Sequence, residues 1–564
     1  MDYVKNYEYW CSMDLPADVR AELKAIENAE DEKKSRFGSD LQFGTAGMRG
    51  IMGVGSNRLN RYTVRRAAQG MAAWLASTDL PQKAAIGYDS RHNSKLFAEI
   101  CAVAFAEVGI HAYLYDRLAP TPMLSFAVRE LGCGCGIVIS ASHNSGEYNG
   151  VKCYGPDGSQ MTDEPAAVVT KTIQTIPYFV PEKKDLATYL DEGMITYIPQ
   201  SVWEKYYDII LAESVNPDII AKAGLNVVYT PLCGTGNEPV REVLGRIGVN
   251  VAVVSCQEKP DGDFKTCEYP NPETDAALAE SYKVAKTTPC DVIIGTDPDA
   301  DRIAIAVPHG DGFKKLTGNE LGCLLMDYVL RARSEKNDIP DGAIVVRSIV
   351  SSPLADRIAA HYGVEMKTVL TGFKYIGGEI LKLEEKNMAD RFIYGYEESC
   401  GYLKGTYARD KDAVVASILV CEIAAALKLE GKNILDALDG LYQTYGQYLA
   451  RVNSLEIKGL DAMEKAAKIL ADFRENAPKT IAGVKVTSFR DYRASVCRDI
   501  ETGEETVINL PKSNVLEFIL GNSGSVIVRP SGTEPKVKFY YTAVAENAEE
   551  ANALLDAMVA QMEG

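Results

Sequence analysis

An alternation of strands and helices recurs three times along this chain of 564 residues, and it limits the possible folds more than any other feature. Each copy ends in an apolar strand that runs into a polar loop: CGIVIS–ASHN at 135–144, CDVIIG–TDPDADR at 290–302 and RFIYG–YEES at 391–399. Such alternation predicts parallel or mixed sheets with helices on both faces. Because ligands of these folds bind at the carboxyl ends of strands, we expect the three loops to meet at one cleft.

The last part of the chain follows a different plan, in which several strands precede one closing helix, as in a small α+β domain. We therefore predict an α/β protein with three similar mixed α/β/α domains and a smaller C-terminal α+β domain around a central active-site cleft. The predicted boundaries are a helical arm at 1–40, then domains at 41–204 with the ASHN loop, 205–312 with the aspartate loop, 313–450 with the YEES loop, and 451–564 with RPSGTEP.

Bulk composition narrows the possible partners and the compartment. The net charge of −18 argues against nucleic acid and anionic membranes, so an anionic substrate would need a local concentration of Arg and Lys. The apolar run at 413–429 contains Glu422 and Lys428, which favours a core helix over a membrane span. No signal peptide is recognised at the N-terminus, and the 13 scattered cysteines are typical of reduced thiols, so we expect a cytoplasmic protein.

The segment GTDPDADR crowds three carboxylates, Asp297, Asp299 and Asp301, into five residues between two apolar runs. Two carboxylates about 4 Å apart repel by about 1 kcal/mol in water and about 4 kcal/mol near a protein surface. A hard divalent cation would relieve this repulsion, and a solvated acidic turn is the alternative. An EF-hand is excluded because its sixth and twelfth positions hold Arg302 and Pro308, so Mg²⁺ is the expected ion.

The ASHN loop places Ser142 beside His143, a combination that can form an activated nucleophile. Adjacent residues on an extended chain point apart, which weakens a Ser–His pair, and ordinary turn chemistry is the alternative. The position of the loop at the end of a buried strand favours a functional role. The following YNGVK supplies Lys152 for an anion.

Two further loops are suited to a phosphorylated sugar. The YEES loop offers Glu397, Glu398 and Ser399, whose side chains can form hydrogen bonds with the hydroxyl groups of a sugar. A solvated turn is the alternative for the same residues. The segment RPSGTEP combines a guanidinium, two hydroxyls and a glycine, as a phosphate cradle or a hairpin turn would. P-loop, dinucleotide and zinc patterns are missing, so nucleotide-dependent kinase activity and zinc chemistry lose support. Taken together, the serine, the aspartates, the hydroxyl-binding residues and the phosphate cradle favour phosphoryl transfer that involves a sugar phosphate.

The order of these motifs resembles the α-D-phosphohexomutase family, specifically its bacterial phosphoglucomutase/phosphomannomutase branch. The motifs that carry the resemblance are FGTAGMRG (43–50), ISASHN (139–144), YNGVK (148–152), GTDPDADR (295–302), TGFKYIG (371–377), GYEESCGY (395–402) and RPSGTEP (529–535). The resemblance implies an isomerase that interconverts glucose 1-phosphate and glucose 6-phosphate. Its cofactors would be one Mg²⁺ per chain and glucose 1,6-bisphosphate, which acts as intermediate and activator.

The resemblance also implies a role for each matched residue. Ser142 would carry the phosphoryl group and bind Mg²⁺ together with Asp297, Asp299 and Asp301. Arg49 would line the reaction site, and Lys411 would transfer a proton, with His143 as its competitor and a charged helix start as the alternative for Lys411. Substrate binding would fall to Lys152, Arg302, Thr371, Gly372, Glu397, Ser399, Arg529, Ser531, Gly532 and Thr533. Arg91, in GYDSRHNS (87–94), would help to close the cleft.

Several alternatives stay open at this stage. The serine loop reads SASHNS where many members of the family have TASHNP, so that Ser145 replaces a proline. Phosphomannomutase, phosphopentomutase or bisphosphate synthase activity would use the same chemistry. A phosphatase and a non-catalytic sugar-phosphate-binding protein belong to other functional classes, and the expected assembly is a monomer or a dimer.

Overall fold

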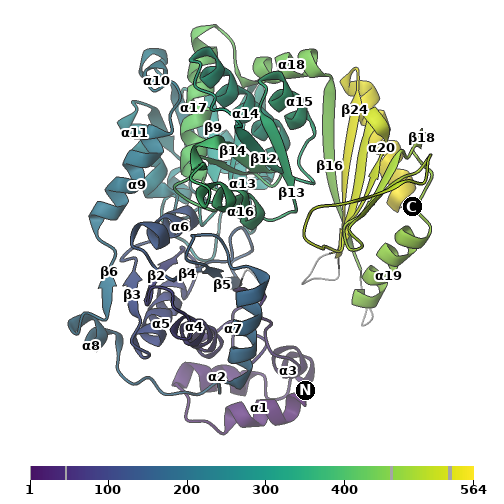
Figure 1. The fold of residues 1–564 in the computed structure, drawn as a ribbon. Coiled ribbons are helices and arrows are strands. Elements are labelled where there is room, and N and C mark those ends of the chain that lie inside the picture. The colour runs from purple at the N-terminus through teal and green to yellow at the C-terminus, as the bar shows by residue number, and fades with distance from the viewer. Residues whose placement is uncertain (1, 45–46, 458–461, 531–535, 564) are drawn as a thin grey trace. The chain divides into compact units, whose positions relative to one another are not determined.

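The structure is a computed structural model that describes residues 2–44, 47–457, 462–530 and 536–563. It divides into two compact units. Unit 1 comprises residues 1–318, 376–395 and 399–432, and unit 2 comprises residues 319–375, 396–398 and 433–564. This division cuts across the four domains expected from the sequence, so their individual boundaries stay predictions. Figure 1 labels many of the elements named below.

The chain begins with three short helices, α1 (Tyr3–Cys11), α2 (Ala17–Ala25) and α3 (Glu30–Phe37). The predicted arm is therefore helical, and it packs on the domain that follows. The indole ring of Trp10 is fully buried, and it meets the rings of Phe37 and Phe179 at centroid distances of 5.8 and 5.0 Å. Burial of these aromatic rings holds the first helices against a segment that lies far along the chain.

The first α/β part of unit 1 is built on a six-stranded sheet in the order β1-β5-β4-β2-β3-β6. Strands β2, β3, β4 and β6 are parallel, whereas β5 pairs antiparallel with β4 and with β1. The strands are β1 (Gly47–Ile51), β2 (Lys83–Tyr88), β3 (His111–Leu114), β4 (Cys135–Ile139), β5 (Tyr148–Tyr154) and β6 (Ile195–Tyr197). The helices are α4 (Arg61–Ala76), α5 (Ser94–Ala106), α6 (Thr121–Glu130), α7 (Asp163–Thr175) and α8 (Leu186–Asp191).

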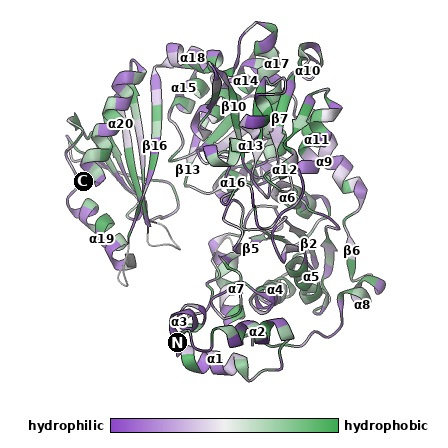
Figure 2. Cartoon of the chain, turned by 180° about the vertical axis from the view of Figure 1, so that it is seen from behind, coloured by the Kyte–Doolittle hydropathy of each residue, from purple (hydrophilic) through white to green (hydrophobic). Residues whose placement is uncertain are grey.

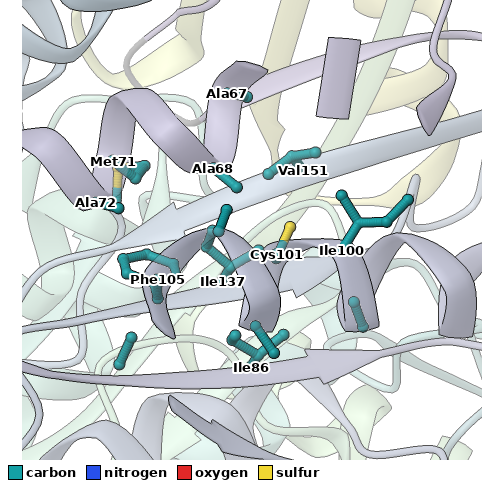
Figure 3. Close-up of a cluster of buried hydrophobic side chains, with 14 of the residues drawn as sticks. Ala67, Ala68, Met71, Ala72, Ile86, Ile100, Cys101, Phe105, Ile137 and Val151 are labelled. Carbon is teal, nitrogen blue, oxygen red and sulfur yellow. The ribbon is translucent and has the colours of Figure 1, made fainter. Parts of the chain in front are cut away.

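Helices α4 and α5 form the core of this part with the sheet beneath them. Figure 3 shows Ala68 and Met71 of α4 and Phe105 of α5 near Ile137 of β4. All five residues of β4 are buried, as expected of a strand with helices on both faces. The burial of β4 fixes the position of the loop that follows it.

The second α/β part of unit 1 is built on a five-stranded sheet in the order β11-β10-β9-β7-β8. Strands β7, β8 and β9 are parallel, and β10 and β11 return antiparallel. The strands are β7 (Asn226–Thr230), β8 (Asn250–Val253), β9 (Val292–Thr296), β10 (Ile303–His309) and β11 (Gly312–Lys315). The helices are α9 (Gln200–Ala212), α10 (Asp218–Ala223), α11 (Asn237–Arg246), α12 (Ser255–Glu258) and α13 (Asp275–Ala285).

The third sheet has the order β13-β12-β14-β15, with β12 and β13 parallel. Its strands are β12 (Ile344–Ser348), β13 (Glu365–Val369), β14 (Phe392–Glu397) and β15 (Gly401–Lys404). The helices of this part are α14 (Gly318–Glu335), α15 (Leu354–His361), α16 (Phe373–Glu384), α17 (Ala413–Leu429) and α18 (Ile434–Tyr445), with a 3-10 turn, η1, at Ala389–Arg391. Helix α17 is mostly buried, as its apolar sequence predicts. No helix among the described residues is both long and apolar enough to cross a membrane.

The C-terminal part of unit 2 is an antiparallel seven-stranded sheet in the order β16-β24-β23-β22-β19-β20-β21. Its strands are β16 (Gln447–Glu456), β19 (Ser488–Asp491), β20 (Val496–Asp499), β21 (Glu505–Val507), β22 (Leu516–Ile519), β23 (Gly524–Pro530) and β24 (Lys536–Ala545). Smaller elements are the hairpin β17 (Thr480–Ile481) and β18 (Val484–Lys485), the 3-10 turn η2 (Gly521–Ser523), and helices α19 (Ala462–Glu475) and α20 (Ala548–Glu563).

Helix α20 has the mixed composition of a helix that covers a sheet. Figure 2 shows hydrophobic and hydrophilic residues alternating along it, and Ala551, Leu555, Met558 and Met562 are its buried residues. Their spacing of three or four residues places them on one helix face. The predicted fold class, with three similar mixed α/β/α domains and a smaller C-terminal α+β domain, is confirmed.

Candidate active site

The serine loop connects the buried strand β4 to β5. Ser142 has a φ angle of 53°, in the left-handed region that non-glycine residues rarely adopt, and its N–H donates to Ser140 Oγ at 2.8 Å. The side chain of Ser142 lies 3.1 Å from His143, measured from Oγ to Nδ1. The expectation that these neighbours point apart is wrong, because the backbone turns sharply at Ser142 and is not extended.

The aspartate loop connects β9 to β10 and is almost completely buried. Asp297, Asp299 and Asp301 are each at most 2% exposed, and they can offer ligand oxygens that all lie within 4.8 Å of one another. Asp297 Oδ1 accepts hydrogen bonds from the N–H groups of Asp301 and Arg302 at 3.1 and 3.0 Å. The loop therefore curls around its own first carboxylate, and three carboxylates converge where the sequence predicts them to.

The two loops meet directly. Ser142 Oγ donates a hydrogen bond of 2.9 Å to Asp297 Oδ2. This contact joins the carboxyl ends of two strands that belong to different sheets of unit 1, as the repeated plan of the chain predicts. A group carried on Ser142 would thus lie beside the acidic cluster.

Two lysines reach into the acidic cluster. Lys152 Nζ, from β5, lies 2.5 Å from Asp299 Oδ2 and 3.2 Å from Asp301 Oδ2. Lys411 Nζ, from the segment before α17, lies 3.3 Å from Asp301 Oδ2 and 3.0 Å from Asp410 Oδ1. Burial works to lower the pKa of Lys152, but the carboxylates of Asp299 and Asp301 more than offset it and hold that pKa above its usual value.

The pKa values of Asp297 and Asp301 are shifted in opposite directions. Burial, together with the charges of Asp301 and Asp299, holds the pKa of Asp297 well above its usual value. Burial also disfavours ionisation of Asp301, but the charges of Lys152, Lys411 and Arg302 overcome it, so the pKa of Asp301 lies below its usual value. Additional positive charge near Asp297 would therefore favour its ionised form.

The free oxygens of the cluster fit a divalent cation. Within the described part of the chain, Asp299 Oδ1 and Asp301 Oδ1 are buried and have no hydrogen-bond partner. The opposite oxygen of Asp299 is held by Lys152 and by Thr121, whose Oγ1 donates to it at 2.8 Å. Buried oxygens without partners are costly, and a cation bound by oxygen ligands would satisfy them.

Two arginines border this centre. Arg302, directly after Asp301, donates to Glu273 Oε1 at 2.8 Å. Burial lowers the pKa of Arg302, but the charges of Glu273, Asp301 and Asp297 outweigh it and raise that pKa above its usual value. Arg49 Nη1 donates to Asn144 Oδ1 of the serine loop at 2.8 Å. Both residues thus lie at the positions where the sequence predicts reaction-site cations.

His143 is the second titratable group beside Ser142. Burial, followed by the nearby charges of Arg302 and Arg49, lowers the pKa of His143 well below its usual value. The imidazole is therefore neutral at pH 7. With the hydroxyl of Ser142 donated to Asp297, the Nδ1–H tautomer of His143 can donate to Ser142 Oγ.

The predicted sugar and phosphate residues fall mainly in unit 2. Glu397 Oε1 accepts a hydrogen bond of 2.6 Å from the N–H of Gly372, and so joins two of the predicted motifs. Thr371 precedes Gly372, Arg529 lies near the end of β23, and Ser399 belongs to unit 1. Ser531, Gly532 and Thr533 lie outside the described residues.

Sequence reasoning did not identify several residues that hold the site together. Thr121 begins α6 and contacts Asp299, and Glu273 anchors Arg302. The signals for them were the Pro120–Thr121–Pro122 helix start and the PNPE segment at 270–273. Arg91, which is expected to help to close the cleft, has a side chain fully enclosed beneath the serine loop, and its part in closure stays a prediction.

Comparison with known families gives matches over most of the chain. Four domain descriptions match in order: Phosphoglucomutase/phosphomannomutase, alpha/beta/alpha domain I at residues 40–178, domain II at 204–310, domain III at 317–445 and the C-terminal domain at 459–561.

Individual relatives cover nearly the whole chain. A phosphoglucomutase of Staphylococcus aureus is 37% identical over 535 residues, which are 94% of this chain and 94% of that protein. A phosphoglucomutase of Staphylococcus epidermidis is 37% identical and covers 90% of this chain and 92% of its own length. The crystal structure of a phosphoglucomutase/phosphomannomutase family protein from Burkholderia thailandensis has a TM-score of 0.67 at 17% identity, covers 93% of this chain and 98% of its own, and supports the fold.

The chain belongs to the phosphoglucomutase/phosphomannomutase family. The predicted membership of the α-D-phosphohexomutases and the predicted enzyme class are thereby confirmed.

Proposed function

We propose that this protein interconverts glucose 1-phosphate and glucose 6-phosphate through a phosphoserine at Ser142 and glucose 1,6-bisphosphate. The observation that carries the proposal is the hydrogen bond of 2.9 Å between Ser142 Oγ and Asp297 Oδ2, inside a buried cluster of three aspartates and two lysines. The phosphoglucomutases that match over 94% and 90% of this chain support glucose as the sugar.

The acidic cluster would hold one Mg²⁺ through Asp297, Asp299 and Asp301, together with an oxygen of the phosphoryl group on Ser142. Bound there, the ion would neutralise charge on the phosphoryl group during its transfer. One oxygen of Asp299 is already held by Thr121 and one oxygen of Asp301 by Lys411, whereas both oxygens of Asp297 accept hydrogen bonds from the protein. The chain thus orients the remaining oxygens before any ligand binds.

In the first transfer, the free hydroxyl oxygen of glucose 1-phosphate attacks the phosphorus on Ser142. The bond between phosphorus and Ser142 Oγ breaks, and Oγ leaves with the electron pair. We assign the proton of the sugar hydroxyl to Lys411, which can accept it only after releasing to water the proton that it carries beside Asp301 and Asp410. We assign the hydrogen bond to the departing oxygen to His143, because its Nδ1 lies 3.1 Å from Ser142 Oγ. Ser142 Oγ then takes a proton from water, so that Ser142 ends as a free hydroxyl.

The second transfer is the same reaction in reverse on the other phosphate. Glucose 1,6-bisphosphate turns over, and Ser142 Oγ releases its proton to water and attacks the phosphorus at carbon 1. The bond between that phosphorus and the sugar oxygen breaks, and Lys411 returns a proton to the oxygen. Glucose 6-phosphate leaves, and the phosphoserine is restored. Arg49, Lys152 and Arg302 would bind phosphate oxygens near Ser142 during both transfers.

The remaining predicted residues would recognise the sugar and its distal phosphate. Glu397 and Ser399, with Thr371 and Gly372, would bind hydroxyl groups of the sugar. Arg529, Ser531, Gly532 and Thr533 would bind the phosphate that does not react. Domains at 41–204, 205–312, 313–450 and 451–564 would each contribute one of these loops, and the small-molecule substrate would be the main partner.

Rates on three sugar phosphates test this proposal. With Mg²⁺ and a trace of the matching bisphosphate, glucose 1-phosphate should be isomerised faster than mannose 1-phosphate or ribose 1-phosphate, without release of inorganic phosphate. A higher rate on mannose or ribose would reassign the sugar. Free phosphate formed as fast as substrate is lost would indicate a phosphatase, and binding without any reaction would indicate a sugar-phosphate-binding protein.

A further inference from the structure

The guanidinium of Arg91 is the buried support of the serine loop. Nη2 donates to the carbonyl of Ser142 at 2.7 Å and also to the carbonyl of Asn144, whereas Nη1 donates to the carbonyls of Ser145 at 2.7 Å and Tyr148 at 3.0 Å. The Arg91 side chain has no exposed surface. One side chain therefore satisfies four carbonyls of a single loop, including that of the proposed nucleophile.

The serine loop needs such a support because of its shape. Ser142 adopts a φ of 53°, which costs about 1–3 kcal/mol for a non-glycine residue unless its surroundings hold it there. A loop that turns in this way directs several carbonyls inward, where no strand partner is available. The planar guanidinium presents donors in a fixed fork, and a lysine ammonium at the same place could not span carbonyls on both sides.

Arg91 is itself held by two contacts with Asp89 and by the ring of Phe264. Asp89 Oδ2 forms an ion pair with Arg91 Nε at 3.3 Å, and Asp89 Oδ1 accepts from the Arg91 N–H at 3.0 Å and from Ser94 Oγ at 2.7 Å. The ring of Phe264 lies 4.9 Å from the guanidinium. Phe264 belongs to the segment before α13 that also carries Glu273, the partner of Arg302. Arg91 therefore joins the serine loop to the layer that carries the aspartate loop.

We propose that Arg91 is a positioning residue that holds Ser142 in the orientation required for phosphoryl transfer, an inference that rests on the proposed function. Arg91 acts through the loop backbone, because its enclosed side chain cannot touch the substrate. A nucleophile that is misplaced by about 1 Å can lose about 100-fold in rate. Loss of the guanidinium should therefore lower kcat and leave KM for glucose 1-phosphate nearly unchanged.

The main test compares Arg91→Lys with Arg65→Lys. Arg65 is a matched control because it is also buried in unit 1, where its Nη2 donates to Glu107 Oε1 at 2.7 Å, and none of its hydrogen bonds to described residues involves the serine loop. Both variants should lose some thermal stability. R91K should lose about 100-fold in kcat per folded molecule, whereas R65K should keep the kcat of the unchanged protein.

A readout that does not depend on activity tests the loop directly. Hydrogen exchange of a peptide that covers 140–150 should be at least several-fold faster in R91K, and exchange of β7 (Asn226–Thr230) should be unchanged. In R65K both segments should exchange as in the unchanged protein. Equal exchange of the loop in R91K and the unchanged protein, or equal kcat, would overturn the proposal.

Asp89→Asn provides a second variant if R91K does not fold. It retains the oxygen that accepts from Arg91 N–H and Ser94, and it replaces the charged partner of Arg91 Nε by an amide. We expect kcat to fall about tenfold with KM unchanged, and an unchanged kcat in folded D89N would contradict the proposal. If the unchanged protein did not isomerise glucose 1-phosphate, the proposed function itself would fail, whereas an active protein with fully active R91K and D89N would refute only the role of Arg91.

Discussion

Ser142 Oγ and Asp297 Oδ2 share a hydrogen bond of 2.9 Å although 155 positions separate them in the chain. The contact brings a hydroxyl nucleophile to the edge of a buried acidic cluster. If Ser142 carries the transferred phosphoryl group, Ser142→Ala should abolish isomerisation and should never gain the mass of one phosphoryl group when glucose 1,6-bisphosphate is added. Intact-mass measurement with a coupled assay for glucose 6-phosphate checks both expectations.

Ser145→Ala is the matched control for that experiment, because it removes a hydroxyl from the same loop and leaves the carbonyl that binds Arg91. It should still be phosphorylated once. Phosphorylation of S142A would show that the nucleophile is another residue, whether or not S145A is also phosphorylated.

Lys411 can act either as a proton-transfer group or as a counter-charge for Asp301, from which it lies 3.3 Å away. Lys411→Arg separates the two roles, since arginine keeps the positive charge but cannot release a proton. If Lys411 transfers the proton, K411R and K411M should both lose about 10²–10⁴-fold in kcat. If K411R kept most of the rate while K411M lost it, the counter-charge would be the dominant role and His143 would become the candidate for the proton.

Thr121 decides which oxygen of Asp299 is free, because its Oγ1 donates to Asp299 Oδ2 at 2.8 Å and leaves Oδ1 without a partner among the described residues. Loss of such a contact to a metal ligand typically weakens metal binding by about 10–100-fold. Thr121→Val should therefore bind Mg²⁺ about tenfold more weakly than the unchanged protein when the ion is titrated by calorimetry. Thr121→Ser, which keeps the hydroxyl, should bind Mg²⁺ normally, and equal affinity of T121V and T121S would show that the contact is unimportant.

Asp412 should make unit 1 less stable as the pH rises from about 4 to about 6. Burial raises the pKa of Asp412 to about 6. Hydrogen bonds from Tyr407, Tyr206 and the first N–H groups of α17 favour the ionised form and lower this pKa, but burial outweighs them. The folded protein thus binds more protons than the unfolded chain in this window, so stability is highest below the unfolded pKa and falls as the pH passes the folded one. A shift of about two units corresponds to about 3 kcal/mol.

Asp412→Asn removes this titration and still offers an oxygen to cap α17. The difference in unfolding free energy between D412N and the unchanged protein, measured in urea at pH 4 and at pH 7, should change by about 3 kcal/mol in favour of the variant at the higher pH. A difference that stays constant between the two pH values would show that Asp412 does not titrate in this range.

The elements of the fold were largely predictable from local patterns. Buried parallel strands such as β4 and β9 are short apolar runs that end in polar loops, and α17 is an uninterrupted helical segment after an Asp cap. Each of these signals depends on neighbouring residues alone, so a sequence displays it directly. The packing of Trp10 against Phe179 could not be predicted in the same way, because it joins segments that no local pattern relates.

The residue types of the site were predictable for a similar reason. Three aspartates in five residues require a positive partner wherever they lie, since like charges repel at short range. By contrast, the pairing of Lys411 with Asp301 and of Thr121 with Asp299 depends on how separate layers pack. Sequence reasoning therefore identified the three clustered carboxylates and Lys411 but not how they pair, and it missed Thr121.

The sequence by itself determined that polar loops follow buried strands, and that they carry a serine and three clustered aspartates; its hydroxyl-binding pair and phosphate cradle stay predictions. Local periodicity and charge spacing are sufficient for this, because they act over a few residues. Only the tertiary structure decided that the backbone turns left-handed at Ser142, that Ser142 meets Asp297, and that Arg91 lies enclosed beneath the serine loop. Those relationships arise where separate layers of the fold pack together, and packing is a property of the whole chain.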